Sequence, residues 1–263
     1  GRRVCFSQRR EIVTPRMSPV RPDLETLADR PAPCPSIVRL GATHVERRQL
    51  QRLLAELYDA PVAHQVHDFL ITDPREAAAL QDSDTLPPTD EQLLIAETED
   101  GLAMSLYLHP AVLQRLAQHC PMRALDDGNL QDYCTALEGV SHFHYVSWST
   151  ACDRNVSLLE LELQAEVDKY ASALSLLLAQ HEGRFPAELF RRLFEGGELL
   201  PHLGAEERGR YREAHRFAAR FCARLEERFL RRRQARPAAM LAELRAFYRL
   251  GRHAKLRHAA QWC

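Results

Sequence analysis

The stretch SLLELELQAEVDKYASALSLLLAQH, residues 157–181, decides the fold of this 263-residue chain. Its first half alternates apolar and polar side chains, as a half-buried β-strand would. Apolar residues also recur at intervals of three and four along the whole stretch, which is the period of an α-helix. Ser157 and Glu160 match a capping box at its start. Because only the helical period extends over the full length, we expect one long helix, packed inside the protein or forming an oligomer seam.

The region before this helix contains the clearest strand signal. The runs LLIAE (93–97) and LAMSLYL (102–108) flank an Asp-Gly pair at 100–101, which predicts a β-hairpin because glycine adopts positive φ without steric strain. We expect a third strand at 131–138. Helices at 43–58 and 110–118 should pack on this sheet. Residues 141–152 suit a strand by composition and a short helix by context, and we favour the helix.

The region after Gly183 carries helical patterns throughout, at 185–196, 205–234 and 237–250. The fold class is therefore α+β and predominantly helical, with a small antiparallel sheet, packed helices and a basic all-helical C-terminal extension. We divide the chain into a disordered or extended lead-in (1–40), an acidic α+β domain (41–183) and a basic helical region (184–263) that forms an extension or part of the same core. Met17 is an alternative start, so residues 1–16 are left out of the fold argument.

Charge is distributed unevenly along the chain. Residues 184–263 hold 19 of the 35 Lys and Arg residues but only 9 of the 36 Asp and Glu residues. Such an imbalance favours contact with an acidic partner, either a protein or a nucleic acid, or docking on the acidic part of the same chain.

Arginines occupy every fourth position from Arg208 to Arg232. Because four residues rotate a helix by about 40° past a full turn, this row winds around the helix, and its first half should lie opposite the apolar face. Aromatic side chains between the cations further on are compatible with single-stranded nucleic acid. The candidate polyanion-binding residues are Arg208, Arg212, Arg216, Arg220, Arg231, Arg232, Arg233, Arg252, Lys255 and Arg257.

A second group of residues points to metal or acid–base chemistry. Carboxylates and imidazoles gather between residues 138 and 168, and together they suit a divalent metal. The candidate metal ligands are Glu138, His142, His144, Glu162 and Glu166. On a helix, His142 and His144 are about 200° apart and cannot share an ion, whereas on a strand they face the same side.

These patterns leave three hypotheses about function. The first is a non-enzymatic intracellular protein that binds an acidic partner through its basic C-terminal helices. The second is a metal-assisted hydrolase that uses the cluster at 138–168, and the third is a self-associating helical scaffold. The seven cysteines form no CxxC pair and no long apolar run is present, so we expect a cytoplasmic protein without a membrane span. No nucleotide-binding or nucleophile-elbow motif occurs, and no cofactor is expected.

Overall fold

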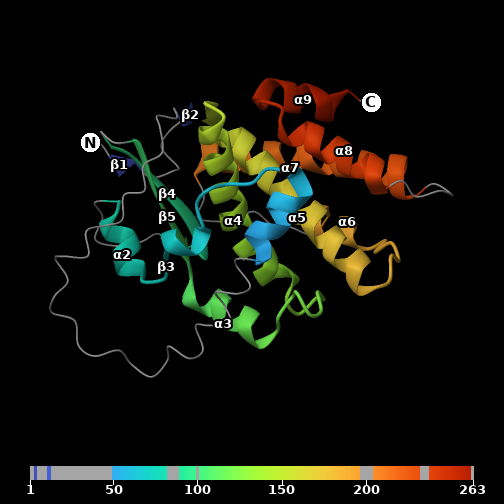
Figure 1. Ribbon diagram of the computed structural model, residues 1–263, viewed down its shortest axis with the longest axis horizontal. Helices are drawn as coiled ribbons and strands as arrows, with labels where there is room; N and C mark the ends of the chain where they lie inside the picture. Colours follow the sequence, from blue (N-terminus) through green and yellow to red (C-terminus); the bar gives the residue numbers. More distant parts are fainter. Residues whose placement is uncertain are drawn as a thin grey trace.

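The computed structural model describes residues 3–4, 11–12, 49–81, 89–98, 101–195, 204–231 and 237–261. Within these residues the protein is α+β and predominantly helical, as the sequence predicts (Figure 1). Two long helices form the centre, a small sheet lies on one side of them, and the C-terminal helices lie on the other (Figure 1).

The central helices are α4 (Leu130–Ala151) and α5 (Leu158–Gln180), which pack against each other. The helical prediction for 157–181 is thus confirmed. The Ser157 hydroxyl accepts a hydrogen bond from the Glu160 amide at 3.3 Å, which is the expected N-cap. Both helices are buried around most of their circumference, so neither presents an unpartnered apolar stripe.

The sheet is built on the predicted hairpin of β4 (Glu91–Thr98) and β5 (Gly101–Leu108). These strands pair antiparallel, with Glu91 opposite Leu108 and Thr98 opposite Gly101. The short strand β3 (Leu70–Ile71) pairs parallel with β5, and β1 (Arg3–Val4) pairs antiparallel with β4. A separate pair joins β2 (Glu11–Ile12) to β6 (Val156–Ser157). The rest of the lead-in lies outside the described residues.

The third strand predicted at 131–138 is wrong, because these residues form the first turns of α4. The more exposed positions of this stretch, Gln131, Thr135 and Glu138, recur at helical spacing, and the stretch continues without a break into the rest of α4. Strand β3 lies beside β5 instead, and its parallel pairing makes the sheet mixed and not purely antiparallel as predicted.

Shorter helices close the open ends of this arrangement. The chain is helical over 49–58, although the predicted start at Thr43 lies outside the described residues. A 3-10 turn, η3 (Val66–Phe69), precedes β3. Helix α2 (Pro74–Ala79) has Asp73 as its N-cap, and α3 (Pro110–Gln118) follows β5 directly.

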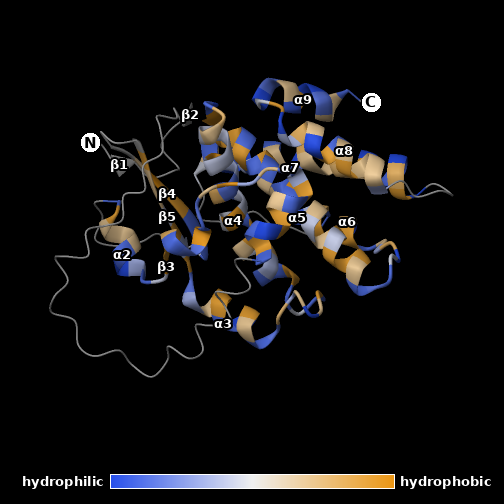
Figure 2. Ribbon diagram, in the orientation of Figure 1, coloured by the Kyte–Doolittle hydropathy of each residue, from blue (hydrophilic) through white to orange (hydrophobic). Residues whose placement is uncertain are grey.

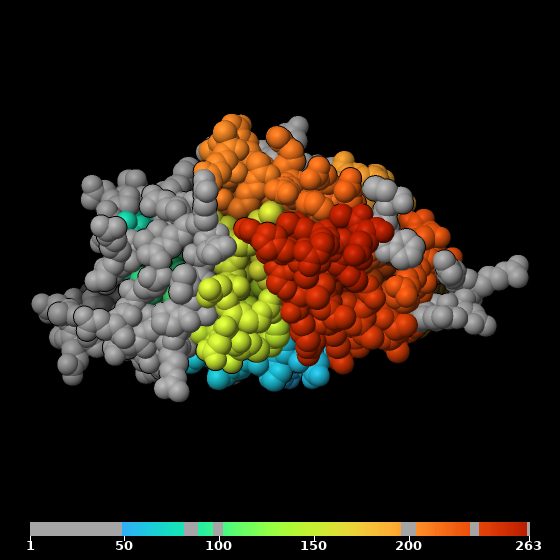
Figure 3. All heavy atoms as spheres, turned by 90° about the horizontal axis from the view of Figure 1, so that it is seen from above, coloured from blue at the N-terminus to red at the C-terminus, as the bar shows by residue number. Residues whose placement is uncertain are grey.

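The C-terminal elements are α6 (Leu189–Phe194), α7 (Ala205–Leu225), the π-helical turn η4 (Glu226–Leu230), α8 (Pro237–Tyr248) and α9 (Arg252–Ala260). Helix α9 was not predicted, and Gly251, the residue after the helix predicted at 237–250, is its N-cap. Their buried side chains belong to the same apolar cluster as those of α4 and α5. Figure 3 shows the C-terminal residues (red) beside those of α4 (yellow-green). Figure 2 shows hydrophobic and hydrophilic residues interspersed along the C-terminal helices. Residues 204–231 and 237–261 therefore complete the core that α4 and α5 begin.

Candidate metal centre

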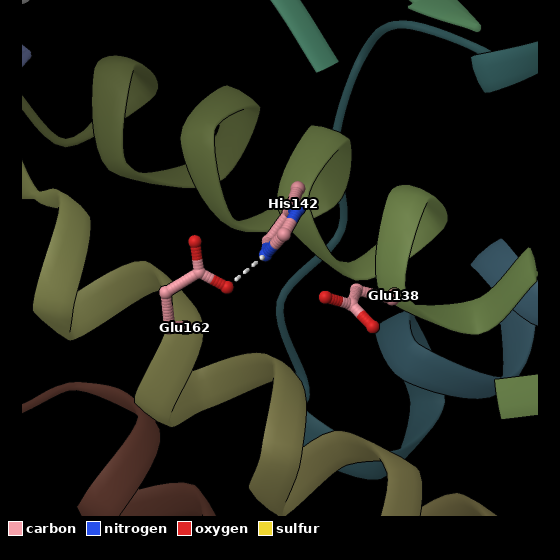
Figure 4. Close-up of side chains that lie close together, drawn as sticks. All are labelled: Glu138, His142 and Glu162. Carbon is pink, nitrogen blue, oxygen red and sulfur yellow. Dashed lines mark ion pairs between the residues drawn. The ribbon is translucent and has the colours of Figure 1, made fainter. Parts of the chain in front are cut away.

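The candidate site lies where α4 faces α5. Glu138 and His142 are one turn apart on α4, so they share a face of the helix, and Glu162 on α5 points toward them (Figure 4). His142 Nε2 is 3.4 Å from Glu162 Oε2, and both side chains are only 3% exposed. One ligand atom from each of the three residues lies within 4.8 Å of the others. Three of the five predicted metal ligands therefore come together.

Glu91 of strand β4 reaches the same place because Gly139 leaves room for it. A Cβ atom at position 139 would lie 2.7 Å from Leu106 Cδ1 and 2.9 Å from Glu91 Oε2. Glycine thus permits the close approach of α4 to the hairpin. The Oε2 atom of Glu91 is enclosed and has no hydrogen-bond partner among the described residues.

The charges of this cluster shift its proton equilibria strongly. Burial raises the pKa of Glu91 well above its ordinary value, and the nearby carboxylates of Glu138 and Glu162 raise it further. Burial alone would lower the pKa of His142, but its hydrogen bond to Glu162 and the charges of Glu162, Glu91 and Glu138 outweigh burial and raise it to about 9. A cation would therefore compete with a proton on His142 at neutral pH.

A chain of ion pairs borders the site on α5. Lys169 Nζ lies 2.6 Å from Glu138 Oε2 and 2.7 Å from Glu166 Oε1. His215 Nδ1, from α7, lies 2.7 Å from Glu166 Oε2. Burial would raise the pKa of Glu166, but Lys169 and His215 lower it to about 2. Glu166 was predicted as a metal ligand, but it faces Lys169 and His215 and does not join the group formed by Glu138, His142 and Glu162, so its assignment is corrected.

Helix α7 contributes two residues that the sequence did not suggest. Arg210 Nε lies 4.0 Å from Glu162 Oε1. The pKa of the Tyr211 phenol is raised, most of all by the nearby carboxylate of Glu162. Burial and the charges of Glu138 and Glu91 raise it further. No local motif marks this pair, because their place depends on the packing of α7 against α5.

His144 does not belong to the site. Residues 141–152 are helical, as expected, so His142 and His144 point in different directions. His144 Nδ1 lies 3.0 Å from the Tyr248 hydroxyl in α8, and burial lowers its pKa to about 4. The inclusion of His144 among the metal ligands is therefore corrected.

The predicted polyanion-binding residues divide into two groups. Arg208, Arg212, Arg216 and Arg220 are exposed on α7, and no ion pair joins them to another described residue. The guanidinium groups of Arg216 and Arg220 lie over the Phe217 ring, at 5.1 and 6.0 Å. Arg257 of α9 is exposed as well. The first half of the row is thus available to a partner.

Two of the remaining cations that the structure describes are paired or enclosed. Arg231 pairs with the buried Glu226 at 2.8 Å. Lys255 is fully buried, donates to Gln164 and lies 4.3 Å from the centre of the Tyr145 ring, so its assignment to a binding surface is wrong. The reason is that α9, unforeseen in the sequence, packs this side chain into the core. Arg252 is partly buried, and Arg232 and Arg233 lie outside the described residues.

The donor set indicates which ion the centre suits. Two carboxylates and one imidazole are harder ligands than a thiolate set, and oxygen-rich sites favour Mn²⁺ and Mg²⁺. The imidazole favours Mn²⁺ over Mg²⁺, since nitrogen is a common ligand of first-row transition metals. Glu138 is 18% exposed, so the centre can exchange ligands with solvent at that end.

No described helix has the length and apolar character needed to cross a bilayer. Comparison of the chain with known protein families, with curated proteins and with solved structures gave no match.

Proposed function

We propose that this chain is a metal-assisted hydrolase whose cation is bound by Glu138, His142 and Glu162. The observation that carries this proposal is that the three side chains, from two different helices, place their ligand atoms within 4.8 Å of one another. Burying several carboxylates and an imidazole together opposes folding unless protons, counter-charges or a cation compensate them. A divalent ion compensates the carboxylates of the centre directly.

The chemistry follows from the ion and from Glu91. A bound divalent cation lowers the pKa of a water ligand and polarises an ester or amide oxygen, which is the basis of metal-assisted hydrolysis. Glu91 keeps its proton at a higher pH than an ordinary glutamate, because burial and its acidic neighbours raise its pKa. A carboxyl group that stays protonated near neutrality suits proton transfer to a leaving group.

Metal binding is tested on the full-length chain after removal of metal with a chelator. Addition of Mn²⁺ should raise the melting temperature, because an ion that binds only the folded state stabilises it. At 100 times the dissociation constant, the gain is about 2.7 kcal/mol. Mg²⁺ and Ca²⁺, which prefer sites made of oxygen alone, should have smaller effects.

Two histidines of α4 provide a matched comparison. His142→Asn should weaken Mn²⁺ binding at least about tenfold, which corresponds to about 1.4 kcal/mol. His144→Asn removes an equally buried imidazole on the same helix but should leave Mn²⁺ binding unchanged, because His144 faces Tyr248. If the cluster is only a structural ion-pair network, no divalent ion should shift the melting temperature of the wild-type chain.

The exposed arginines favour a second function, which is the binding of an acidic partner without catalysis. We propose this function for Arg208, Arg212, Arg216 and Arg220 only, because they are exposed and form no ion pair with another described residue. Binding through these residues should weaken steeply as salt is added. Binding that is insensitive to salt between 50 and about 300 mM would exclude it. Self-association through α5 is not proposed, since that helix packs on α4 and α7 within one chain.

A further inference from the structure

We infer that the acidic partner of the exposed arginines is a single-stranded nucleic acid, whose phosphates lie along Arg208, Arg212, Arg216 and Arg220 of α7. This inference rests on the second proposed function and deepens it, and it does not depend on the metal centre. The strand is a ligand of this surface and undergoes no reaction there.

The four arginines form one cationic row on the outer face of α7. They are exposed, and no ion pair joins them to another described residue. Arginines on the flanks of the same helix have carboxylates beside them, since Arg210 lies 3.7 Å from Glu207 and Arg224 lies 3.4 Å from Glu243. Residues of α7 (orange) lie along one edge of the molecule in Figure 3. The row is therefore a concentration of positive charge that a partner can reach from solvent.

The shape of the row favours a flexible strand over a stiff rod. With 3.6 residues per turn and a rise of 1.5 Å per residue, the row from Arg208 to Arg220 extends about 18 Å along α7 and turns about 120° around it. A straight rod that touches the middle of the row, at Arg212 and Arg216, lies away from both of its ends. A DNA duplex, with a persistence length of about 150 base pairs, is such a rod, and so is an acidic α-helix. A single strand can bend and follow all four arginines.

The density of charge favours a nucleic acid over an acidic protein. A stacked strand carries one phosphate for about every 3.4 Å, so about five phosphates fit along the row. An acidic helix offers the same match only if it carries a carboxylate at every fourth position. The charged side chains of the row are all arginine, and α7 contains no lysine. The planar guanidinium donates two parallel hydrogen bonds to phosphate oxygens, which a lysine ammonium does not.

Phe217 prepares two of these arginines for binding. The guanidinium groups of Arg216 and Arg220 lie 5.1 and 6.0 Å from the centre of its half-buried ring. This contact restricts two long side chains, so less conformational freedom is lost when they bind a phosphate. An aromatic ring beside a row of cations is also the usual arrangement of surfaces that bind single strands, because the ring can meet a base.

The experiment measures how binding depends on salt. Fluorescein-labelled single strands of DNA and RNA are titrated with the full-length chain in EDTA, and anisotropy is recorded. Four phosphate contacts predict a slope of about −2.8 for the logarithm of affinity against the logarithm of salt concentration, or about a 50-fold loss between about 50 and 200 mM salt. The variant Arg212→Gln/Arg216→Gln/Arg220→Gln should bind at least about tenfold more weakly at the lowest salt, with a slope of about −0.7.

Two control variants keep the row intact. Arg52→Gln/Arg75→Gln/Arg123→Gln removes three exposed arginines from other surfaces and should bind like the wild type, with the same slope. His142→Asn should also bind strands like the wild type, because the metal centre lies on the inner side of α7, where Arg210 faces Glu162. Equal loss of binding in the row variant and the arginine control would overturn the inference and the second proposed function together.

Two other polyanions test the class of partner. A duplex of the same sequence should give a shallower slope, about −1.8, because a stiff rod reaches only about two of the arginines. A duplex slope as steep as that of the single strand would overturn the inference. Poly-L-glutamate should compete at least about tenfold less well than unlabelled strand. If it binds the row as tightly as the strand does, the nucleic-acid inference fails while the second proposed function stands. If neither polymer binds the wild type, both fail.

Discussion

The proton on His142 gives the most direct test of the electrostatics of the site. In the metal-free protein, hydrogen bonding to Glu162 and three nearby carboxylates raise the pKa of His142 from 6.5 to about 9, against the opposing effect of burial. At about 1.4 kcal/mol for each unit of pKa, the folded state gains about 3 kcal/mol from this proton. Because the pKa is raised on folding, this stability is fully present below about pH 6.5 and is lost as the pH rises through about 9.

The assay is urea unfolding, followed by circular dichroism, of the metal-free chain at pH 6, 7, 8 and 9. Other groups also titrate in this window. Burial lowers the pKa of Lys255, so this lysine makes the folded state more stable as the pH rises above its depressed pKa, opposite in sign to His142. The wild type must therefore be compared with His142→Asn, which keeps Lys255 and removes the imidazole.

The difference in unfolding free energy between the wild type and His142→Asn should shrink by about 3 kcal/mol from pH 6 to pH 9. Saturating Mn²⁺ should reverse this trend for the wild type, because the ion needs unprotonated His142 and binds more tightly as the pH rises. A difference between the two proteins that stays constant with pH would refute the assignment of a raised pKa to His142.

Four further substitutions test the packing and the charges. Gly139→Ala should destabilise the fold by about 1–3 kcal/mol in thermal unfolding, because the new Cβ would meet Leu106 and Glu91, although alanine favours the helix by about 1 kcal/mol. Glu91→Gln should make the metal-free chain more stable than the wild type at pH 9 but not at pH 4, since the amide resembles the protonated acid that burial favours. The measurement is denaturation at both pH values. A stability difference between the two proteins that is the same at pH 4 and pH 9 would contradict the raised pKa of Glu91. Arg231→Ala should lower the unfolding free energy, because it leaves the buried Glu226 carboxylate without its guanidinium partner, whereas Arg216→Ala should change it by less than about 0.5 kcal/mol. Equal effects in urea unfolding would contradict the division of the arginine row.

Local patterns in the sequence determined much of the architecture. The hairpin at 93–108 follows from Asp-Gly between two apolar runs, and α5 follows from its helical period and the Ser157 cap. The exposure of Arg212, Arg216 and Arg220 follows from their angle to the apolar face of α7. Each of these features depends on residues within a few turns or strand positions of one another, which is the range that periodicity and capping describe.

Tertiary packing decided the rest. The sequence grouped Glu138, His142 and Glu162, but only the contact of α4 with α5 faces them toward one another, and only the space at Gly139 admits Glu91 from the hairpin. Residues 131–138 form helix rather than strand because they continue into the rest of α4, and their more exposed positions, 131, 135 and 138, recur at helical spacing. Long-range contacts also enclosed Lys255, which composition alone had assigned to the surface. Such contacts depend on which helix faces meet, and residue spacing along one segment carries no information about that.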